Sequence, residues 1–218
     1  MSIIVHRRSL LLAGAAVALV PAVAPTSAWA SPDLGKPAPL FTGTDTNGKT
    51  WSLADLKGKV VVLETTNHQC PYVAKHYRAG NMQAQQREAT AKGVIWLTVA
   101  ASAPGEEGFV NASQANDLTK SRNAAPTAVI LDPQSKIARA YGATVTPHMY
   151  IIDASGVLVY KGGIDSIPSA DTADIAKATQ YVRVALDQVL SGKQVAEAST
   201  RPYGCSLKYP RSFCEVRR

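Results

Sequence analysis

The sequence lacks a long apolar run, a block of like charges and an internal repeat. The apolar run from Leu10 to Val20 is too short for a bilayer core, which needs roughly 20 residues, so no stable membrane insertion is expected. The net charge of +7 is spread along the chain, and no nucleic-acid partner is expected; the basic residues from Arg211 to Arg218 are interpreted as a solvated terminus.

The N-terminal segment has the pattern of an export signal. Arg7 and Arg8 precede the apolar run, and Ala28-Trp29-Ala30 follows it as a small-residue cleavage site. Paired arginines in this position resemble a bacterial twin-arginine signal. We therefore expect residues 1–30 to be removed and the protein to be periplasmic, with one domain over residues 31–192 and a tail over residues 193–218.

Cysteine usage indicates thiol chemistry. The three cysteines are Cys70, Cys205 and Cys214, and in an oxidising compartment any two of them that come close will tend to form a disulfide. Because the number is odd, at least one thiol stays free or has its partner elsewhere.

Hydrophobic patterning predicts an α/β fold. Asn47-Gly48 marks a tight hairpin, and the short β-branched run ending at Thr66 is typical of a strand buried on both faces. The expected order is hairpin, strand, helix, strand, polar helix, strand, short helix, β-hairpin and closing helix. After the first hairpin these elements are expected at residues 59–66, 71–91, 94–100, 104–120, 127–131, 134–141, 148–161 and 173–190.

Cys70 lies where the first core strand passes into a helix. Pro71 suits the first helical turn, so backbone N–H groups and the positive end of the helix dipole are expected to converge on the sulfur of Cys70. Such surroundings lower a cysteine pKa from about 8.5 to between roughly 3.5 and 7.5 and make the thiolate a nucleophile.

The stretch Cys70-Pro71-Tyr72-Val73 resembles the Cys-Pro-Tyr-Cys site of the thioredoxin-like superfamily, with valine in place of the second cysteine. The resemblance implies a mixed central sheet flanked by helices, with the N-terminal hairpin and C-terminal tail added to it. It also implies a buried acid at Glu64, which could accept a proton or simply be a partnered strand acid, and a cis peptide bond at Thr146-Pro147. Thr146 would offer its backbone groups to an extended partner segment.

A second resemblance, from about Leu34 to Leu190, is to the redoxin branch with its AhpC/TSA and TlpA-like proteins. It is carried by Trp51 to Leu63 and by Asn67-His68-Gln69-Cys70-Pro71. The tail motif Pro202-Tyr203-Gly204-Cys205 resembles that of a group of bacterial redoxins. The peroxiredoxin pattern Pro-x-x-x-Thr-x-x-Cys is not met, because Leu63 and Asn67 stand at its proline and threonine positions.

Two disulfide pairings stay open. With Val73 in place of the local partner, the first choice is Cys70 with Cys205 as the resolving thiol. The alternative is a Cys205–Cys214 clasp, which would leave Cys70 alone.

The leading hypothesis is a thiol oxidoreductase without a cofactor. Its Cys70 thiolate would attack a protein or small-molecule disulfide, or a peroxide, and an unidentified thiol reductant would recycle it. One alternative is a copper-binding or metallochaperone module that uses Cys70 with His68 or His148; His76 is expected to face elsewhere. A further alternative is a disulfide-clasped binding protein with an unreactive Cys70.

Overall fold

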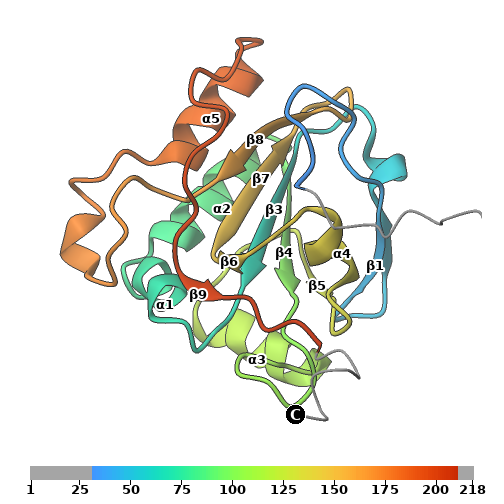
Figure 1. Cartoon of the computed structure of the whole chain (residues 1–218), viewed down its shortest axis with the longest axis vertical. Helices are drawn as coiled ribbons and strands as arrows, with labels where there is room; N and C mark the ends of the chain where they lie inside the picture. Colours follow the sequence, from blue (N-terminus) through green and yellow to red (C-terminus); the bar gives the residue numbers. More distant parts are fainter. Residues whose placement is uncertain (1–30, 211–218) are drawn as a thin grey trace, which may run out of the picture.

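A computed structural model describes residues 31–210 of the chain. Within this range a seven-stranded mixed sheet forms the centre of the molecule (Figure 1). The expected signal peptide, the basic terminus and Cys214 lie outside the described residues. From one edge of the sheet to the other the strands are β2 (Thr50–Ser52), β1 (Thr42–Asp45), β5 (Ala128–Leu131), β4 (Ile95–Ala100), β3 (Val61–Thr66), β7 (His148–Ile152) and β8 (Leu158–Gly162).

The strand directions confirm the predicted thioredoxin-like architecture. β4 pairs parallel with both β3 and β5. β7 pairs antiparallel with both β3 and β8. The N-terminal hairpin of β1 and β2 joins the sheet through an antiparallel contact with β5. β3 therefore lies where the parallel part meets the antiparallel part, between β4 and β7, and Cys70 follows its carboxyl end.

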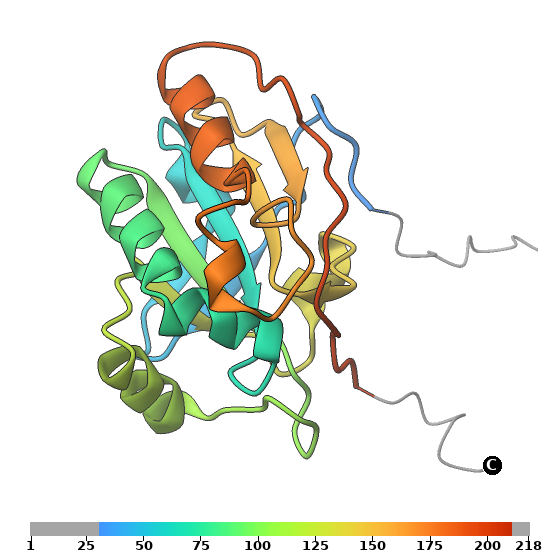
Figure 2. The same ribbon diagram turned by 90° about the vertical axis from the view of Figure 1, so that its left-hand side faces the viewer.

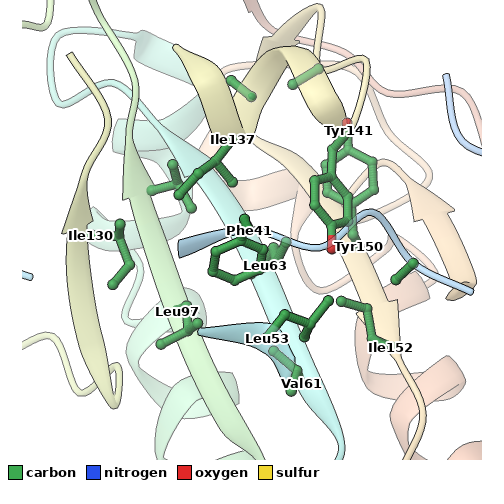
Figure 3. Packing of buried hydrophobic residues seen from close by; sticks show 14 of the residues in the cluster. Phe41, Leu53, Val61, Leu63, Leu97, Ile130, Ile137, Tyr141, Tyr150 and Ile152 are labelled. Atoms are coloured by element: carbon green, nitrogen blue, oxygen red, sulfur yellow. The ribbon is translucent and has the colours of Figure 1, made fainter. Parts of the chain in front are cut away.

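Alternate residues of β3 enter two separate cores, because successive side chains of a strand point to opposite faces. Val61 and Leu63 belong to the first core, together with Phe41, Ile137 and the other residues labelled in Figure 3. Val62 lies on the opposite face, in a second core that also contains Val73 and Cys70. Both faces of β3 are covered, as its continuous apolar run predicts.

Helices cover both faces of the sheet. α1, α2 and α5 contribute to the second core, and Figure 2 shows them together on one side of the sheet. α4 and the N-terminal segment contribute to the first core. The helices are α1 (Pro71–Arg78), α2 (Asn81–Ala91), α3 (Ala112–Ser121), α4 (Lys136–Ala140) and α5 (Tyr181–Leu190), with 3₁₀ turns η1 (Leu53–Leu56) and η2 (Thr172–Asp174).

Three predicted helix boundaries are wrong. The helix expected over residues 71–91 is broken at Gly80, whose φ of 70° ends α1 and begins α2. α3 begins only after Asn111, where the Asn111 and Gln114 side chains form a reciprocal capping box, and not at Pro104. The closing helix begins at Tyr181, because the residues before it form η2 and an irregular segment.

The tail runs back across the molecule after α5. Figure 1 shows it passing from the end of α5 to β9 (Cys205–Ser206), beside β6 (Val145–Thr146). On the way, Lys161 in β8 and Ser199 form an isolated β-bridge. β6 and β9 then form a small antiparallel sheet. The tail is thus part of the folded domain and reaches the end of β3 where Cys70 lies.

Within residues 31–210, no helix is long and apolar enough to cross a membrane.

Candidate active site

Cys70 is the N-cap residue of α1, and Pro71 occupies the first helical turn as predicted. The turn before it is built by Asn67, whose side-chain oxygen accepts the N–H of Gln69 at 2.8 Å and whose carbonyl accepts the N–H of Cys70 at 3.1 Å. Asparagine favours this local turn because its side chain imitates a backbone acceptor. The sulfur of Cys70 therefore lies at the positive end of a helix and is fully buried.

The loop that carries Cys70 is supported from outside. Gln69 accepts the N–H of Gly108 at 2.7 Å, and Arg122 donates to the carbonyl of His68 at 3.1 Å. These contacts connect the turn to the segment before α3 and to the end of α3. They fix the start of α1 and hence the position of the sulfur.

The Thr146-Pro147 peptide bond is cis, as the resemblance implied. The thiol of Cys70 donates to the carbonyl oxygen of Thr146 at 3.2 Å. Thr65, at the end of β3, holds this segment in place: its hydroxyl donates to the carbonyl of Val145 at 3.1 Å and accepts the N–H of His148 at 3.0 Å. A single threonine side chain thus connects both sides of the cis-proline turn to the strand that leads to Cys70.

Cys205 lies opposite Thr146 in the ladder of β6 and β9. Cys205 packs against the core that contains Cys70, and neither cysteine is in a disulfide within the described residues. Burial, together with its interaction with Cys70, raises the pKa of Cys205 to about 12. The structure therefore brings together four of the five predicted site residues: Cys70, Thr146, Pro147 and Cys205.

Glu64 lies apart from this group, although it is buried as predicted. Its carboxylate accepts hydrogen bonds from the Tyr77 hydroxyl at 2.9 Å and from Gln86, Trp96 and Thr98 at 3.1, 2.8 and 3.0 Å. Burial raises its pKa, and the four donors oppose that rise. Among its hydrogen bonds within the described chain none comes from Cys70, so a proton-transfer role stays a prediction.

The histidines proposed as copper ligands are not gathered around the sulfur. His148 stacks on Tyr150 with ring centroids 4.6 Å apart, and His68 lines a small cavity of about 40 Å³ with Thr66 and Arg122. Within residues 31–210 there is no group of three or more His, Cys, Asp or Glu side chains placed to hold a metal ion.

Tyr203, which the sequence analysis did not single out as a site residue, anchors the tail beside α1. Its hydroxyl donates to Asp165 and lies 3.2 Å from Nε2 of His76. His76 does face away from the sulfur, but it is fully buried and contacts the tail. Burial lowers its pKa to about 4, so it is neutral at physiological pH. The motif Pro202-Tyr203-Gly204-Cys205 was the available signal for this contact.

The fold and site define a class of protein: a thioredoxin-like domain with a cysteine at the start of a helix, a cis-proline beside it and a second cysteine delivered by the tail. The sequence matches the AhpC/TSA family over residues 34–161, which is more than half of the chain. The chain belongs to the AhpC/TSA family, in agreement with the redoxin resemblance.

Individual relatives share this fold. The thiol-disulfide oxidoreductase ResA of Bacillus subtilis (strain 168) is 27% identical over 132 residues, which cover 57% of this chain and 64% of ResA. An uncharacterized conserved protein of Geobacillus kaustophilus is 25% identical with a TM-score of 0.70, covering 83% of this chain and 94% of the other.

A third similar protein, from Chlorobium tepidum, is designated a thiol:disulfide interchange protein of the DsbE type. It is 25% identical with a TM-score of 0.50, covering 60% of this chain and 85% of the other. The relatives with assigned names support the interpretation of this chain as an oxidoreductase.

Proposed function

We propose that the protein is an exported thiol-disulfide oxidoreductase in which Cys70 is the attacking thiolate and Cys205 the resolving thiol. The observation that carries the proposal is that both cysteines meet at Thr146: Cys205 lies opposite it in the β6–β9 ladder, and the thiol of Cys70 donates to its carbonyl oxygen. Export is inferred from the arginine pair and apolar run of residues 1–30.

The reaction would proceed by two exchanges. The Cys70 thiolate attacks one sulfur of a substrate disulfide, so that a mixed disulfide forms and the first substrate thiolate leaves with the electron pair. Cys205 then loses its proton and attacks the sulfur of Cys70, which releases the second substrate thiolate. The substrate gains two electrons, and an external thiol reductant restores the Cys70–Cys205 pair.

The geometry supports this assignment of roles to the two sulfurs. Cys70 is fixed at the start of α1, whereas Cys205 is carried by the tail and its pKa is raised to about 12. A thiol that keeps its proton is a poor attacking group, so Cys205 acts second, when the tail brings it back against the sulfur of the mixed disulfide. Disulfides are favoured over peroxides as substrates, because Asn67 replaces the threonine of the peroxiredoxin pattern and its side chain is engaged in the turn before Cys70.

Single cysteine substitutions test the proposal with glutathione disulfide and hydrogen peroxide as substrates. Cys70→Ser should abolish turnover, and Cys205→Ser should accumulate a mixed disulfide on Cys70. Cys214→Ser, the matched control, should retain activity, and the oxidised wild-type protein should yield a Cys70–Cys205 peptide pair in mass spectrometry. Undiminished turnover by Cys70→Ser, or a Cys205–Cys214 pair, would refute the assignment.

A further inference from the structure

The tail covers the sulfur that the proposed reaction must expose. Cys70 has no accessible surface, although both thiols are reduced. Leu207 donates its N–H to the carbonyl of Thr144 at 3.0 Å, and the N–H of Ala103 donates to Lys208 at 2.9 Å. A sulfur in a partner protein can reach Cys70 only after the tail has left this position.

Removal of the tail would uncover a strand edge. Within the described chain, β6 is paired in the small sheet with β9 alone. An unpaired strand edge offers N–H and C=O groups to any extended segment that can lie against it. The edge of β6 beside Cys70 is thus suited to bind a second extended segment after β9 departs.

The position of Cys205 indicates which residue of such a segment would meet Cys70. Cys205 lies opposite Thr146, whose carbonyl also accepts the thiol of Cys70. The residue before it is Gly204, with a φ of 138°. A Cβ built on Gly204 would overlap the carbonyl oxygen of Thr146. The groove therefore accepts a cysteine that is preceded by glycine.

The site of Tyr203 selects the residue before that glycine. Lys75 and Asp165 form an ion pair of 3.2 Å with both side chains fully buried. The Tyr203 hydroxyl donates to Asp165 and lies 3.5 Å from the Lys75 ammonium group. The Tyr203 ring packs edge-to-face on Tyr72 at 5.8 Å. Buried charges need every hydrogen-bond partner they can obtain, so the site favours a tyrosine hydroxyl over a purely apolar ring.

We propose that this groove binds, in place of the tail, an extended segment of a partner protein with the sequence Tyr-Gly-Cys, whose cysteine is in a disulfide. The inference rests on the proposed function and names its substrate class. The Cys70 thiolate attacks the sulfur of the partner cysteine, a new disulfide joins the two proteins, and the other sulfur of the partner disulfide leaves as a thiolate. The tail of the chain occupies the same groove and competes with the partner segment for it.

Three peptide substrates test the inference on the full-length chain with Cys205→Ser and Cys214→Ser, two substitutions that are kept in every variant of this test so that Cys70 supplies the only thiol. The first is Pro-Tyr-Gly-Cys-Ser-Leu, the second has phenylalanine for tyrosine, and the third has alanine for glycine; each carries thionitrobenzoate on its cysteine. Release of thionitrobenzoate measures the reaction of Cys70. We expect the second and third peptides to react at least about tenfold more slowly than the first, from the loss of a hydrogen bond to a charged group and from the clash with Thr146.

A glutathione–thionitrobenzoate disulfide, which has no tyrosine and carries γ-glutamate instead of glycine before its cysteine, separates the possible outcomes. If the three peptides react at equal rates and the glutathione compound also reacts, the inference is overturned and the proposed function stands. No reaction with any of the four compounds would overturn both. In a Cys205→Ser/Tyr203→Phe chain, the tail competes less well, so all three peptides should react faster with their ranking unchanged; unchanged rates would contradict competition by the tail.

Discussion

Gly204 lies so close to the carbonyl oxygen of Thr146 that no side chain fits between them. This contact places the tail strand against the cis-proline turn and Cys205 against Cys70. Glycine is required at this position both for the close approach and for the φ of 138°.

Replacement of Gly204 by alanine is expected to release the tail from β6. Cys70 should then be labelled by a maleimide at least about tenfold faster under reducing conditions, because a clash with backbone costs more than 1.4 kcal/mol. Gly192→Ala is the control: its φ of 69° also disfavours alanine, though less than the φ of 138° at Gly204, and an added Cβ meets no atom of the described residues within 4 Å. Equal labelling rates of Cys70 in the two variants would show that the clash does not control access.

Thr65 is expected to contribute to stability through its contacts with the cis-proline turn. Thr65→Val leaves the buried N–H of His148 and carbonyl of Val145 without this partner, and should lower the free energy of unfolding in urea by about 1–3 kcal/mol. The adjacent Thr66→Val is the control, because the buried hydroxyl of Thr66 has no hydrogen-bond partner among residues 31–210. An equal loss of stability in both variants would contradict the role given to Thr65.

The buried carboxyl of Glu64 should make stability depend on pH. Burial raises its pKa above the ordinary value of 4.5, so the folded chain holds the proton to a higher pH than the unfolded chain. The free energy of unfolding should therefore fall as the pH rises from 4.5 through the raised pKa. Urea unfolding at a series of pH values measures this slope.

Glu64→Gln should remove this part of the slope, because an amide does not titrate, and should retain the fold, because its oxygen can still accept from Trp96 and Thr98. Glu64→Leu, which offers no acceptor to the four donors, should instead cost at least about 3 kcal/mol. An unchanged slope in Glu64→Gln would assign the pH dependence to another group.

Cys205 should resist alkylation at neutral pH. Its pKa is raised to about 12, first by burial and then by its interactions with Cys70. The rate of iodoacetamide modification at Cys205, followed by mass spectrometry of the reduced chain, should rise about tenfold per pH unit from pH 8 to beyond pH 10, because only the thiolate reacts. In Gly204→Ala, where the tail is released, the profile should level off nearer the ordinary value of about 8.5. A plateau near pH 9 in the wild-type chain would contradict the raised pKa.

Local patterns in the sequence predicted the elements that local forces determine. The β-branched run before Cys70 predicted strand β3, and Pro71 marked the start of α1. The break at Gly80 was missed because the apolar pattern continues through it, although a glycine within a predicted helix is itself a warning. The start of α5 at Tyr181 depends on how the preceding segment packs, since Asp165 and the carbonyl of Ile167 both bind Lys75.

In the site, too, the residues of short local motifs could be predicted, whereas contacts between distant segments could not. Cys70, Thr146 and Pro147 were found because each belongs to a short motif, and their placement together confirms the fold that those motifs implied. The cluster around Tyr203 joins residues about 90 to 130 positions apart in the sequence, and helical periodicity on α1 alone gave no indication that the tail would approach His76. Only the path of the tail after α5 brings them together.

Helix α1 connects the two halves of this arrangement. Cys70 is its N-cap residue, and its second turn carries Lys75 and His76, which bind Tyr203. The eight residues of α1 thus fix the distance between the sulfur of Cys70 and the site that binds Tyr203 of the tail. One residue inserted between Pro71 and Lys75 would rotate the second turn by about 100° relative to the first. The tyrosine site and the cysteine site would then no longer accept the same strand.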